Sequence, residues 1–472
     1  MKKTKIVCTI GPSTDNDDIL REMMKSGMDV ARFNFSHSEH SVHEKRFEQV
    51  CRLRSELGLN IATLLDTKGP EVRLKTFKDG SAVLAEGENF TLTTRDVQGD
   101  NTICSISFAN LPKDVSLGTS ILIDDGAIEL KAESVNSTDI VCRVIRGGKV
   151  SDRKGINVPD VNLSMPYISD ADMKDLEFGA KMGFDYIAAS FVRTGADVIY
   201  LRKFTQSLGW FNPRIIAKIE NAQGVENIDE ILEAADGIMV ARGDMGVEIP
   251  FERIPAIQKA LIRKAYNAGK NVITATQMLE SMISNARPTR AEITDVANAI
   301  YDGSSAIMLS GETAAGKYPV EAVKTMSRIA ETTEGAIDYI SRFKKHADEL
   351  DPTITDAIAH ASVTTAHDLN AAAILTVTKS GGTARTLSKF RPNCPIIALT
   401  TDKTTCHQLD LSWGVTPGLM DEKTNTDELI EHAIKVSLEK GYLKKGDLVV
   451  VTAGVPLGIS GTTNLLKVER ID

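Results

Sequence analysis

Apolar, β-branched runs recur along the first two thirds of the chain, and segments with a helical period separate most of them. There are eight such runs: Lys5–Ile10, Val30–Phe35, Ile61–Asp66, Phe184–Phe191, Arg214–Glu220, Gly237–Asp244, Asn271–Gln277 and Ser305–Ser310. Buried parallel strands have this composition, and helical crossovers such as Ser169–Met182 and Ile254–Ala268 must join them. Eight βα units in succession predict a (β/α)8 barrel. A doubly wound sheet is the alternative that the pattern leaves open.

The helical period stops between about residue 70 and residue 167. This stretch is rich in Val, Thr, Gly and Asp, and alternates polar with apolar residues in Ser120–Asp124 and Asp139–Ile145. Alternation of this kind is typical of half-buried strands. We therefore expect an all-β domain inserted after the third barrel strand, on the side where the βα loops gather, so that it can act as a lid.

A third pattern begins after about residue 345. A polar run starting at Arg342 leads into a new βα series, with predicted strands Ala373–Val377, Pro395–Leu399 and Leu448–Thr452. The sequence thus predicts three domains: a barrel formed by residues 1–69 and 168–345, a β-rich lid formed by residues 70–167, and an open α/β regulatory domain formed by residues 346–472.

The chain length agrees with a protein of several domains, and the net charge and the cysteine spacing restrict the class of protein. A chain of 472 residues is too long for one ordinary core, and a net charge of −9 argues against a nucleic-acid binder. The six cysteines are scattered without C-x-x-C spacing, which suits a reducing compartment and a cytoplasmic protein. The N-terminal pattern does not match a signal peptide, and no apolar run approaches the length of a membrane span.

Polar residues gather where the predicted barrel strands end, which is where barrel enzymes hold their active sites. They are Arg32, Asn34, Ser36, Asp66, Thr67, Lys68, Ser190, Lys218, Glu220, Asp244, Thr276 and Ser310. Helix capping would account for a few of them. The concentration of charge favours an active site.

Lys218 and Glu220 are the strongest candidates. Residues i and i+2 of a strand point to one face, so both side chains should project into the barrel mouth. Asp244 ends the next run, and neighbouring strands lie about 5 Å apart, so Glu220 and Asp244 can bind one small cation. Two carboxylates suit Mg²⁺ or Mn²⁺. The alternatives are a simple Lys–Glu pair and an N-cap at Asp244, and the lysine is compatible with either Schiff-base chemistry or an electrostatic clamp.

Other residues could bind anions or a second cation. Arg32, Arg73 and Lys154 are side chains suited to oxyanions. Several polar residues at the barrel mouth could supply oxygen ligands for a monovalent cation. The alternative is that these side chains only cap turns. These residues are Asn34, Ser36, His37, Asp66 and Thr67.

The third domain carries a separate candidate for anion binding. The segment Thr378-Lys-Ser-Gly-Gly-Thr383 follows a predicted strand and opens a predicted helix. Glycines free the backbone, hydroxyls donate hydrogen bonds, and a helix N-terminus favours an anion. An ordinary N-cap is the alternative.

Several long motifs together resemble the pyruvate kinase family, over nearly the whole chain and in the family's order. They are Thr9-Ile-Gly-Pro, Arg32-Phe-Asn-Phe-Ser-His, Leu65-Asp-Thr-Lys-Gly-Pro-Glu-Val-Arg, Lys218-Ile-Glu-Asn, Gly237-Ile-Met-Val-Ala-Arg-Gly-Asp, Thr274-Ala-Thr-Gln-Met-Leu-Glu-Ser-Met, Arg287-Pro-Thr-Arg-Ala-Glu and Met308-Leu-Ser-Gly-Glu-Thr-Ala. Because the first strand starts at Lys5, the resemblance is to the bacterial type, which lacks the extra N-terminal segment of animal members. It implies a homotetramer of barrel, β lid and α/β domain.

The resemblance implies transfer of a phosphoryl group from phosphoenolpyruvate to ADP, giving pyruvate and ATP, the last step of glycolysis. It implies that Glu220 and Asp244 bind Mg²⁺ or Mn²⁺, and that Lys218 contacts the transferring group, which favours the clamp over the Schiff base. It places Arg32 on the substrate phosphate, and Gly243, Asp244 and Thr276 around the carboxylate and enolate. Thr276, or a water that it orients, is a candidate proton donor, with Ser310 behind it.

The resemblance also implies ligands outside the reacting centre. They are a K⁺ site (Asn34, Ser36, Asp66, Thr67), nucleotide contacts (Asn34, His37, Arg73, Lys154) and a phosphate site for a sugar-phosphate activator (Thr378, Ser380, Gly381, Gly382, Thr383). Glu71 matches the K⁺-dependent type, whereas Leu74 replaces a residue that is often threonine. Rival interpretations are a Mg²⁺-dependent enolate lyase or mutase, which needs no ADP, and a non-enzymatic sensor.

Overall fold

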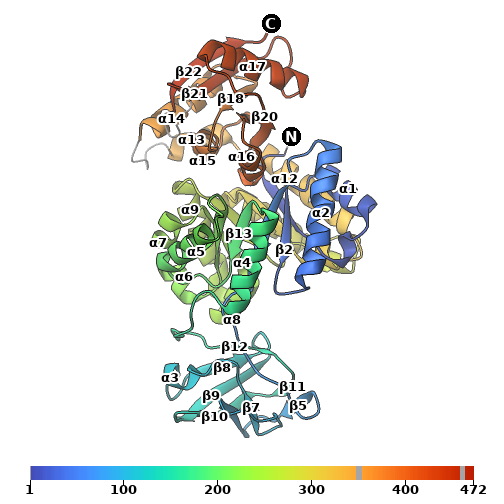
Figure 1. The fold of residues 1–472 in the computed structure, drawn as a ribbon, viewed down its shortest axis with the longest axis vertical. Coiled ribbons are helices and arrows are strands. Elements are labelled where there is room, and N and C mark those ends of the chain that lie inside the picture. Colours follow the sequence, from blue (N-terminus) through green and yellow to red (C-terminus); the bar gives the residue numbers. More distant parts are fainter. Residues whose placement is uncertain (1, 347–352, 458–462) are drawn as a thin grey trace.

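A computed structural model describes residues 2–346, 353–457 and 463–472. Three bodies follow one another along the long axis of the molecule, with the barrel in the middle, the C-terminal domain at one end and the lid at the other (Figure 1). Among the described residues, no helix combines the length and the apolar composition that crossing a membrane requires.

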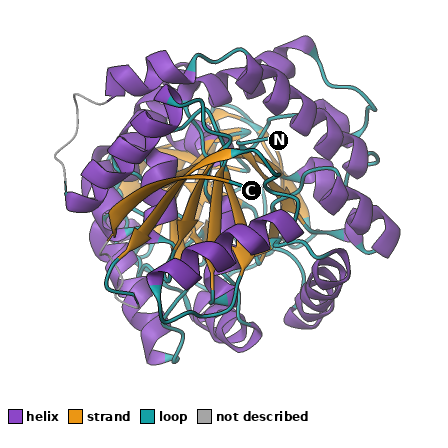
Figure 2. Ribbon diagram, turned by 90° about the horizontal axis from the view of Figure 1, so that it is seen from above, coloured by secondary structure: helices purple, strands orange, loops and turns teal. Residues whose placement is uncertain are grey.

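Eight parallel strands close into a barrel in the order β1-β17-β16-β15-β14-β13-β3-β2, which confirms the barrel and excludes the doubly wound sheet. Seen from above, helices lie around the central strands of the molecule (Figure 2). The strands are β1 Lys5–Thr9, β2 Val30–Asn34, β3 Ala62–Asp66, β13 Tyr186–Ala189, β14 Arg214–Ile219, β15 Gly237–Ala241, β16 Asn271–Ala275 and β17 Ala306–Leu309.

The helices between the strands start at the capping residues that the sequence carries. Ser169 caps α4 with a capping box, and Thr289 caps α10 in the same way. The helices of this part are α1 Asp17–Lys25, α2 His40–Leu57, α4 Asp170–Met182, α5 Gly195–Ser207, α6 Ala222–Glu226, α7 Ile228–Ala234, α8 Arg242–Glu248, α9 Ile254–Asn267, α10 Arg290–Asp302, α11 Gly311–Ala314, α12 Pro319–Gly335 and α13 Tyr339–His346. Short 3₁₀ turns are η1 Pro12–Thr14, η2 Phe251–Arg253 and η3 Glu280–Ile283.

Among the strand predictions that extended too far at their carboxyl ends, two have a common cause. The run Gly237–Asp244 leaves the strand after Ala241, and Asp244 lies in the first turn of α8. The run Asn271–Gln277 leaves the strand after Ala275, since Thr276 and Gln277 have left-handed backbones (φ 67° and 53°). The Arg242 side chain explains both endings, because it binds the carbonyls of Ala275 and Thr276 and ties the two turns together.

The segment inserted between β3 and α4, called the lid below, forms a seven-stranded sheet in the order β4-β12-β8-β9-β10-β6-β7 and a two-stranded sheet, β11-β5. One helical turn, α3 Leu111–Asp114, interrupts the strands. The strands are β4 Val72–Arg73, β5 Ser81–Leu84, β6 Asn89–Thr93, β7 Ile103–Ser105, β8 Ser120–Ile123, β9 Ile128–Val135, β10 Asp139–Arg146, β11 Gly148–Ser151 and β12 Gly155–Asn157. The predicted β-rich insertion is therefore present.

The C-terminal domain is an open five-stranded sheet in the order β20-β19-β18-β21-β22. Its elements are α14 Ile354–Asp368, β18 Ala373–Val377, α15 Gly382–Lys389, β19 Ile396–Thr400, α16 Lys403–Gln408, η5 Leu409–Leu411, β20 Val415–Leu419, α17 Thr426–Glu439, β21 Leu448–Gly454 and β22 Thr463–Arg470. The sequence analysis missed β20 because Pro417 and Gly418 are typical of a turn. Proline is tolerated in β20 because the strand lies at the sheet edge.

Candidate active site

The barrel interior is apolar at its base and charged at its mouth, and β14 shows why. Ile216 belongs to the buried cluster inside the barrel. Lys218 and Glu220 follow at intervals of two residues, so they point to the same face as Ile216. The predicted common direction is confirmed, because the Lys218 Nζ lies 2.9 Å from Glu220 Oε1.

Asp66, at the end of β3, joins Lys218 to Arg32. Its Oδ1 accepts a hydrogen bond from Lys218 Nζ at 3.0 Å, and its Oδ2 accepts one from Arg32 Nε at 2.6 Å. Arg32 also donates to Thr9 Oγ1 at 2.9 Å, and Lys218 donates to Ser190 Oγ at 2.8 Å. One buried carboxylate therefore sets two cations side by side at the mouth.

These charges shift one another's protonation. Burial opposes ionisation of Asp66, but Arg32 and Lys218 outweigh burial and hold the pKa of Asp66 below its ordinary value. Burial likewise opposes the Lys218 ammonium, but the carboxylates of Asp66 and Glu220 outweigh it and hold the pKa of Lys218 above its ordinary value. Both groups are therefore charged at neutral pH.

Glu220 is less fully compensated. Burial raises the pKa of Glu220 to about 7, and the negative charge of Asp244 adds to this rise against the opposing effect of Lys218. Its Oε2 accepts the Phe191 backbone N–H at 2.6 Å, whereas its buried Oε1 has the Lys218 ion pair but no partner in hydrogen-bond geometry. This carboxylate has one oxygen available for a cation.

Asp244 is the neighbouring carboxylate. No ion pair or hydrogen bond engages it within the part of the chain that the structure describes. No group of three or more acidic, His or Cys side chains converges as a metal site among these residues. A cation held by Glu220 and Asp244 would thus take its other ligands from substrate oxygens and water, as Mg²⁺ commonly does.

Gly243 and Thr276 lie next to Asp244. The Gly243 N–H donates to Thr276 Oγ1 at 2.9 Å, and the Thr276 hydroxyl donates to the Ala275 carbonyl at 2.6 Å. A Cβ added to Gly243 would approach Thr276 at 3.6 Å, an ordinary contact, so packing alone does not require glycine there. The two carboxylates, Gly243 and Thr276 come from the ends of three consecutive strands.

The residues considered for a monovalent cation come together at the ends of β2 and β3. Asn34 pairs with Asp66 in the strand register, and Asn34 Oδ1 accepts the Ser36 N–H at 3.1 Å. Thr67 Oγ1 accepts the Ser190 N–H at 3.1 Å. Capping contacts are thus present, and the register places Asn34 beside Asp66.

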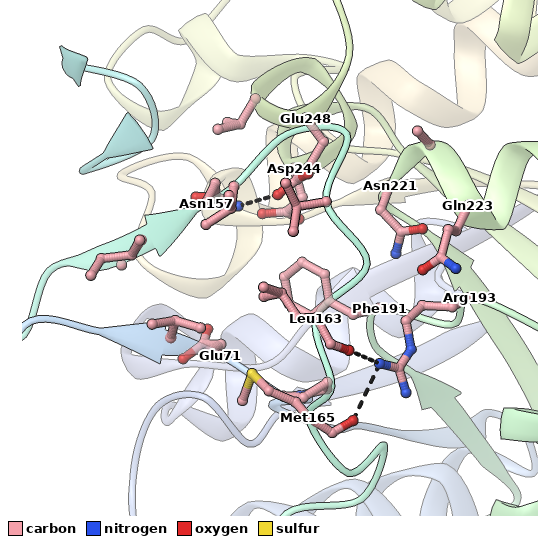
Figure 3. Close-up of a pocket in the computed structure, with 18 of the residues that line it drawn as sticks. Glu71, Asn157, Leu163, Met165, Phe191, Arg193, Asn221, Gln223, Asp244 and Glu248 are labelled. Atoms are coloured by element: carbon pink, nitrogen blue, oxygen red, sulfur yellow. Dashed lines mark hydrogen bonds between the residues drawn. The ribbon is translucent and has the colours of Figure 1, made fainter. Parts of the chain in front are cut away.

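A cavity of about 710 Å³ separates the lid from the barrel mouth, and Asp244 lies in its wall (Figure 3). His37 lines it from the barrel, and Arg73 and Lys154 line it from the lid. In the lid, Arg73 Nε donates to Glu71 at 2.7 Å, and Lys154 Nζ donates to Asp124 at 2.8 Å. Basic side chains of the lid and the Asp244 carboxylate therefore line the same cavity.

Among the cavity residues that were not predicted as site residues are Asn157, Arg193 and Glu248. Arg193 donates to the carbonyls of Leu163 and Met165 at 3.2 and 3.3 Å. Arg193 follows the fourth strand run by two residues, and that position was the available signal. Nothing in the local pattern distinguishes Asn157 or Glu248.

The loop that follows β18 forms a compact turn beside the barrel base. Gly381 has φ 78° and donates its N–H to Thr378 Oγ1 at 3.1 Å, and α15 begins at Gly382. The hydroxyls of Thr383 and Thr463 lie 2.6 Å apart. The resemblance also implies that the loop of residues 458–464 closes over the effector, but this loop lies outside the described residues except for Thr463 and Asn464.

The fold and the site define a class: a (β/α)8-barrel enzyme with a carboxylate–lysine centre under a β lid. Family models match the chain as "Pyruvate kinase, barrel domain" over residues 1–323 and "Pyruvate kinase, alpha/beta domain" over residues 356–469. The chain belongs to the pyruvate kinase family, whose members are phosphotransferases.

Individual relatives agree over the full length. The chain is 48% identical to a pyruvate kinase of Clostridium acetobutylicum, with 100% of both chains covered. It is 49% identical to a pyruvate kinase of Geobacillus stearothermophilus, covering 100% of this chain and 80% of that one. A crystal structure of a pyruvate kinase from Cryptosporidium parvum superposes with a TM-score of 0.94 at 40% identity, covering 100% of this chain and 96% of that one.

Proposed function

We propose that this phosphotransferase moves the phosphoryl group of phosphoenolpyruvate to ADP. The bond between phosphorus and the enol oxygen breaks, a bond to a terminal phosphate oxygen of ADP forms, and the enolate takes a proton at its methylene carbon to give pyruvate. The observation that carries the proposal, besides the family, is the pair of cations that share Asp66. Charge compensation and positioning are what phosphoryl transfer mainly needs.

In this proposal Arg32 binds the substrate phosphate and Lys218 contacts the group in transfer. Attraction between unit charges 4 Å apart is worth roughly 4 kcal/mol at an effective dielectric near 20, so two cations offset a large part of the repulsion between the anionic substrates. Their fixed positions, set by Asp66, mean that little reorganisation is needed as charge moves.

Glu220 and Asp244 would hold the divalent cation, Mg²⁺ or Mn²⁺. The open Glu220 Oε1 and the unpaired Asp244 carboxylate fit a hard cation with oxygen ligands. When bound, this ion supplies Lewis-acid stabilisation of the enolate oxygen. Gly243 and Thr276 would line the substrate carboxylate beside it, with Thr276 orienting the proton donor and Ser310 behind.

Asn34, Ser36, Asp66 and Thr67 would hold K⁺. Their donor set consists of neutral oxygens and one carboxylate, which suits a large monovalent cation better than a divalent one. We expect activity to fall at least about tenfold, equivalent to about 1.4 kcal/mol of transition-state stabilisation, when K⁺ is replaced by tetramethylammonium. Unchanged activity would remove the K⁺ site from the proposal.

The nucleotide would occupy the cavity between lid and barrel, against Asn34, His37, Arg73 and Lys154. This feature separates the proposal from a lyase or mutase on an enolate, which would need no second anionic substrate. The test is a coupled assay for ATP made from phosphoenolpyruvate and ADP. Consumption of phosphoenolpyruvate without ADP would favour the rival.

We further propose activation by a phosphorylated sugar at the loop from Thr378 to Thr383, in a cytoplasmic homotetramer. The turn at Gly381 and the hydroxyls of Thr378, Ser380 and Thr383 are suited to a phosphate at the start of α15. The cysteines, all free among the described residues, are consistent with a reducing compartment.

An activity screen across sugar phosphates and AMP would identify the effector, and gel filtration would give the oligomeric state. Thr383→Glu should abolish activation by repelling the phosphate. Activation that survives this substitution for every compound tested would contradict the effector site.

A further inference from the structure

Among the described residues, one side-chain hydrogen bond joins the lid sheet to the barrel. Asn157 Nδ2, at the end of β12, donates a hydrogen bond of 2.7 Å to Glu248 Oε1, at the end of α8 (Figure 3). Within the described residues, this is the only hydrogen bond or ion pair between residues 72–157 of the lid and the barrel. We call this contact the latch.

The barrel side of the latch belongs to the helix that carries Asp244. Residues four apart lie on one face of a helix, so Asp244 and Glu248 face the same way. Both line the cavity beneath the lid. A lid residue bound to Glu248 is therefore held about one helical turn from the carboxylate proposed to bind the metal.

The lid side of the latch belongs to the ribbon that carries both lid cations. In the β4–β12 pair, Gly155 lies opposite Arg73, and Lys154 immediately precedes β12. The Arg73 guanidinium also donates to the Arg153 carbonyl at 2.8 Å. Lys154 is three residues from Asn157, about 10 Å along a strand. Fixing Asn157 thus fixes the position of Lys154 and Arg73 over the mouth.

Other lid contacts cannot replace this one. Arg193 holds the exit segment at Leu163 and Met165, which lies beyond the sheet. Lys154 pairs with Asp124 inside the lid. Arg73 pairs with Glu71, whose other cation, Lys68 at 3.7 Å, lies three residues away on the same entry segment, so neither ion pair reaches α8.

We propose that Asn157 and Glu248 are positioning residues that set the lid in register with α8, and so hold Lys154 and Arg73 at the nucleotide. Neither touches the reacting atoms in this proposal. Because a ligand's apparent affinity falls with the fraction of protein in the binding-competent state, loss of the latch weakens nucleotide binding before it affects chemistry. The inference rests on the proposed nucleotide site.

The test is steady-state kinetics of the full chain, with each variant first checked for an unchanged unfolding temperature. Asn157→Ala and Glu248→Ala should each raise the KM for ADP about tenfold and change the KM for phosphoenolpyruvate and kcat less than about twofold, since only nucleotide affinity passes through the lid. Combining them should add little, because both remove the same bond. Asn101→Ala, at an exposed lid position that does not line the cavity, should leave the KM for ADP near its original value.

A reversed pair, in which the carboxylate and the amide exchange places, distinguishes loss of the latch from a general loss of structure. Asn157→Asp alone places two carboxylates together and should raise the KM for ADP further. Adding Glu248→Gln supplies an amide donor facing the new carboxylate and should restore most of the affinity. An unchanged KM for ADP in Asn157→Ala would overturn the latch. So would equal losses for both substrates, or a reversed pair no better than Asn157→Asp.

A separate measurement distinguishes failure of the latch from failure of the nucleotide site. Lys154→Met should weaken ADP binding even if the latch substitutions do nothing. If Lys154→Met also leaves the KM for ADP unchanged, the nucleotide site itself is wrong, and the latch falls with it.

Discussion

Strand β14 carries a cation at each end, and the two ends differ in how their charges are compensated. At the amino end, Arg214 NH1 donates to Asp236 Oδ1 at 2.7 Å, while Arg202 and the Ile215 N–H occupy Oδ2. At the carboxyl end, Lys218 pairs with Asp66 and Glu220, and Glu220 keeps one oxygen without a hydrogen-bond donor.

The difference is visible in the protonation of the two carboxylates. Burial opposes ionisation of both, fully at Glu220 and in part at Asp236, but Arg214 and Arg202 outweigh it at Asp236 and lower the pKa of that carboxyl. Glu220 has one cation and the competing charge of Asp244, and its pKa rises to about 7. At the amino end, the Asp236 carboxylate is thus fully paired within the protein. At the carboxyl end, the Glu220 carboxylate still has an oxygen that can bind a ligand.

The largest effect should come from removing the cation at the carboxyl end. Lys218→Met should lower kcat on the order of 10³-fold, because a preorganised charge at the transferring group is lost. The fold and Mn²⁺ binding should be largely intact, as measured by circular dichroism and by water-proton relaxation. Near-normal turnover would refute the role of Lys218.

The second largest effect should be on metal affinity, which distinguishes the Glu220 carboxylate from the Asp236 carboxylate. Glu220→Gln should weaken Mn²⁺ binding on the order of a hundredfold, because a neutral amide replaces a charged ligand in a site of low dielectric. Asp236→Asn, at the other end of the strand, is the matched control and should bind Mn²⁺ normally. Equal affinities in the two variants would contradict the assignment of Glu220.

The amino end should matter for regulation instead. Arg214 NH2 donates to the Ser380 carbonyl at 3.4 Å, and Arg385 binds the same carbonyl at 2.5 Å, so β14 is joined to the loop proposed to bind the effector. Arg214→Met should reduce the activation ratio about fivefold, a loss at the low end of typical coupling energies. If Arg214→Met kept full activation and changed kcat instead, the amino end of β14 would act in catalysis and not in regulation.

The smallest effect concerns Asp410, in η5 beneath the barrel. Burial, opposed in part by Lys5, raises the pKa of its carboxyl well above the ordinary range. The folded state then holds the proton more tightly than the unfolded state, so this stability is fully present at low pH and is lost as pH rises through the folded pKa.

Asp410→Asn cannot titrate and should escape that loss. Its unfolding temperature should exceed that of the unsubstituted protein by a few degrees at pH 8, and by less at pH 5. Asp96→Asn, whose carboxylate is 92% exposed, should show no such trend. A gain that is independent of pH would indicate a packing effect.

Some elements could be predicted from sequence because their cause is local. The run from Ala373 to Val377 forms β18 at the predicted residues, and Ser169 starts α4 as a cap. The prediction was wrong for other elements, because a contact with a residue far away in sequence sets their backbone conformation. The turn at Thr276 depends on Arg242, 34 residues away, so the local apolar pattern continued the strand too far.

The sequence by itself determined that Lys218 and Glu220 share a face, because the two-residue period of a strand fixes side-chain direction locally. Only the tertiary structure decided which side chains, distant in sequence, contact them. Asp66 is 152 residues from Lys218 in the chain, and Asn157 is 91 residues from Glu248. Barrel closure brings the first pair together, and docking of the lid brings the second, because both depend on long-range packing that no local pattern encodes.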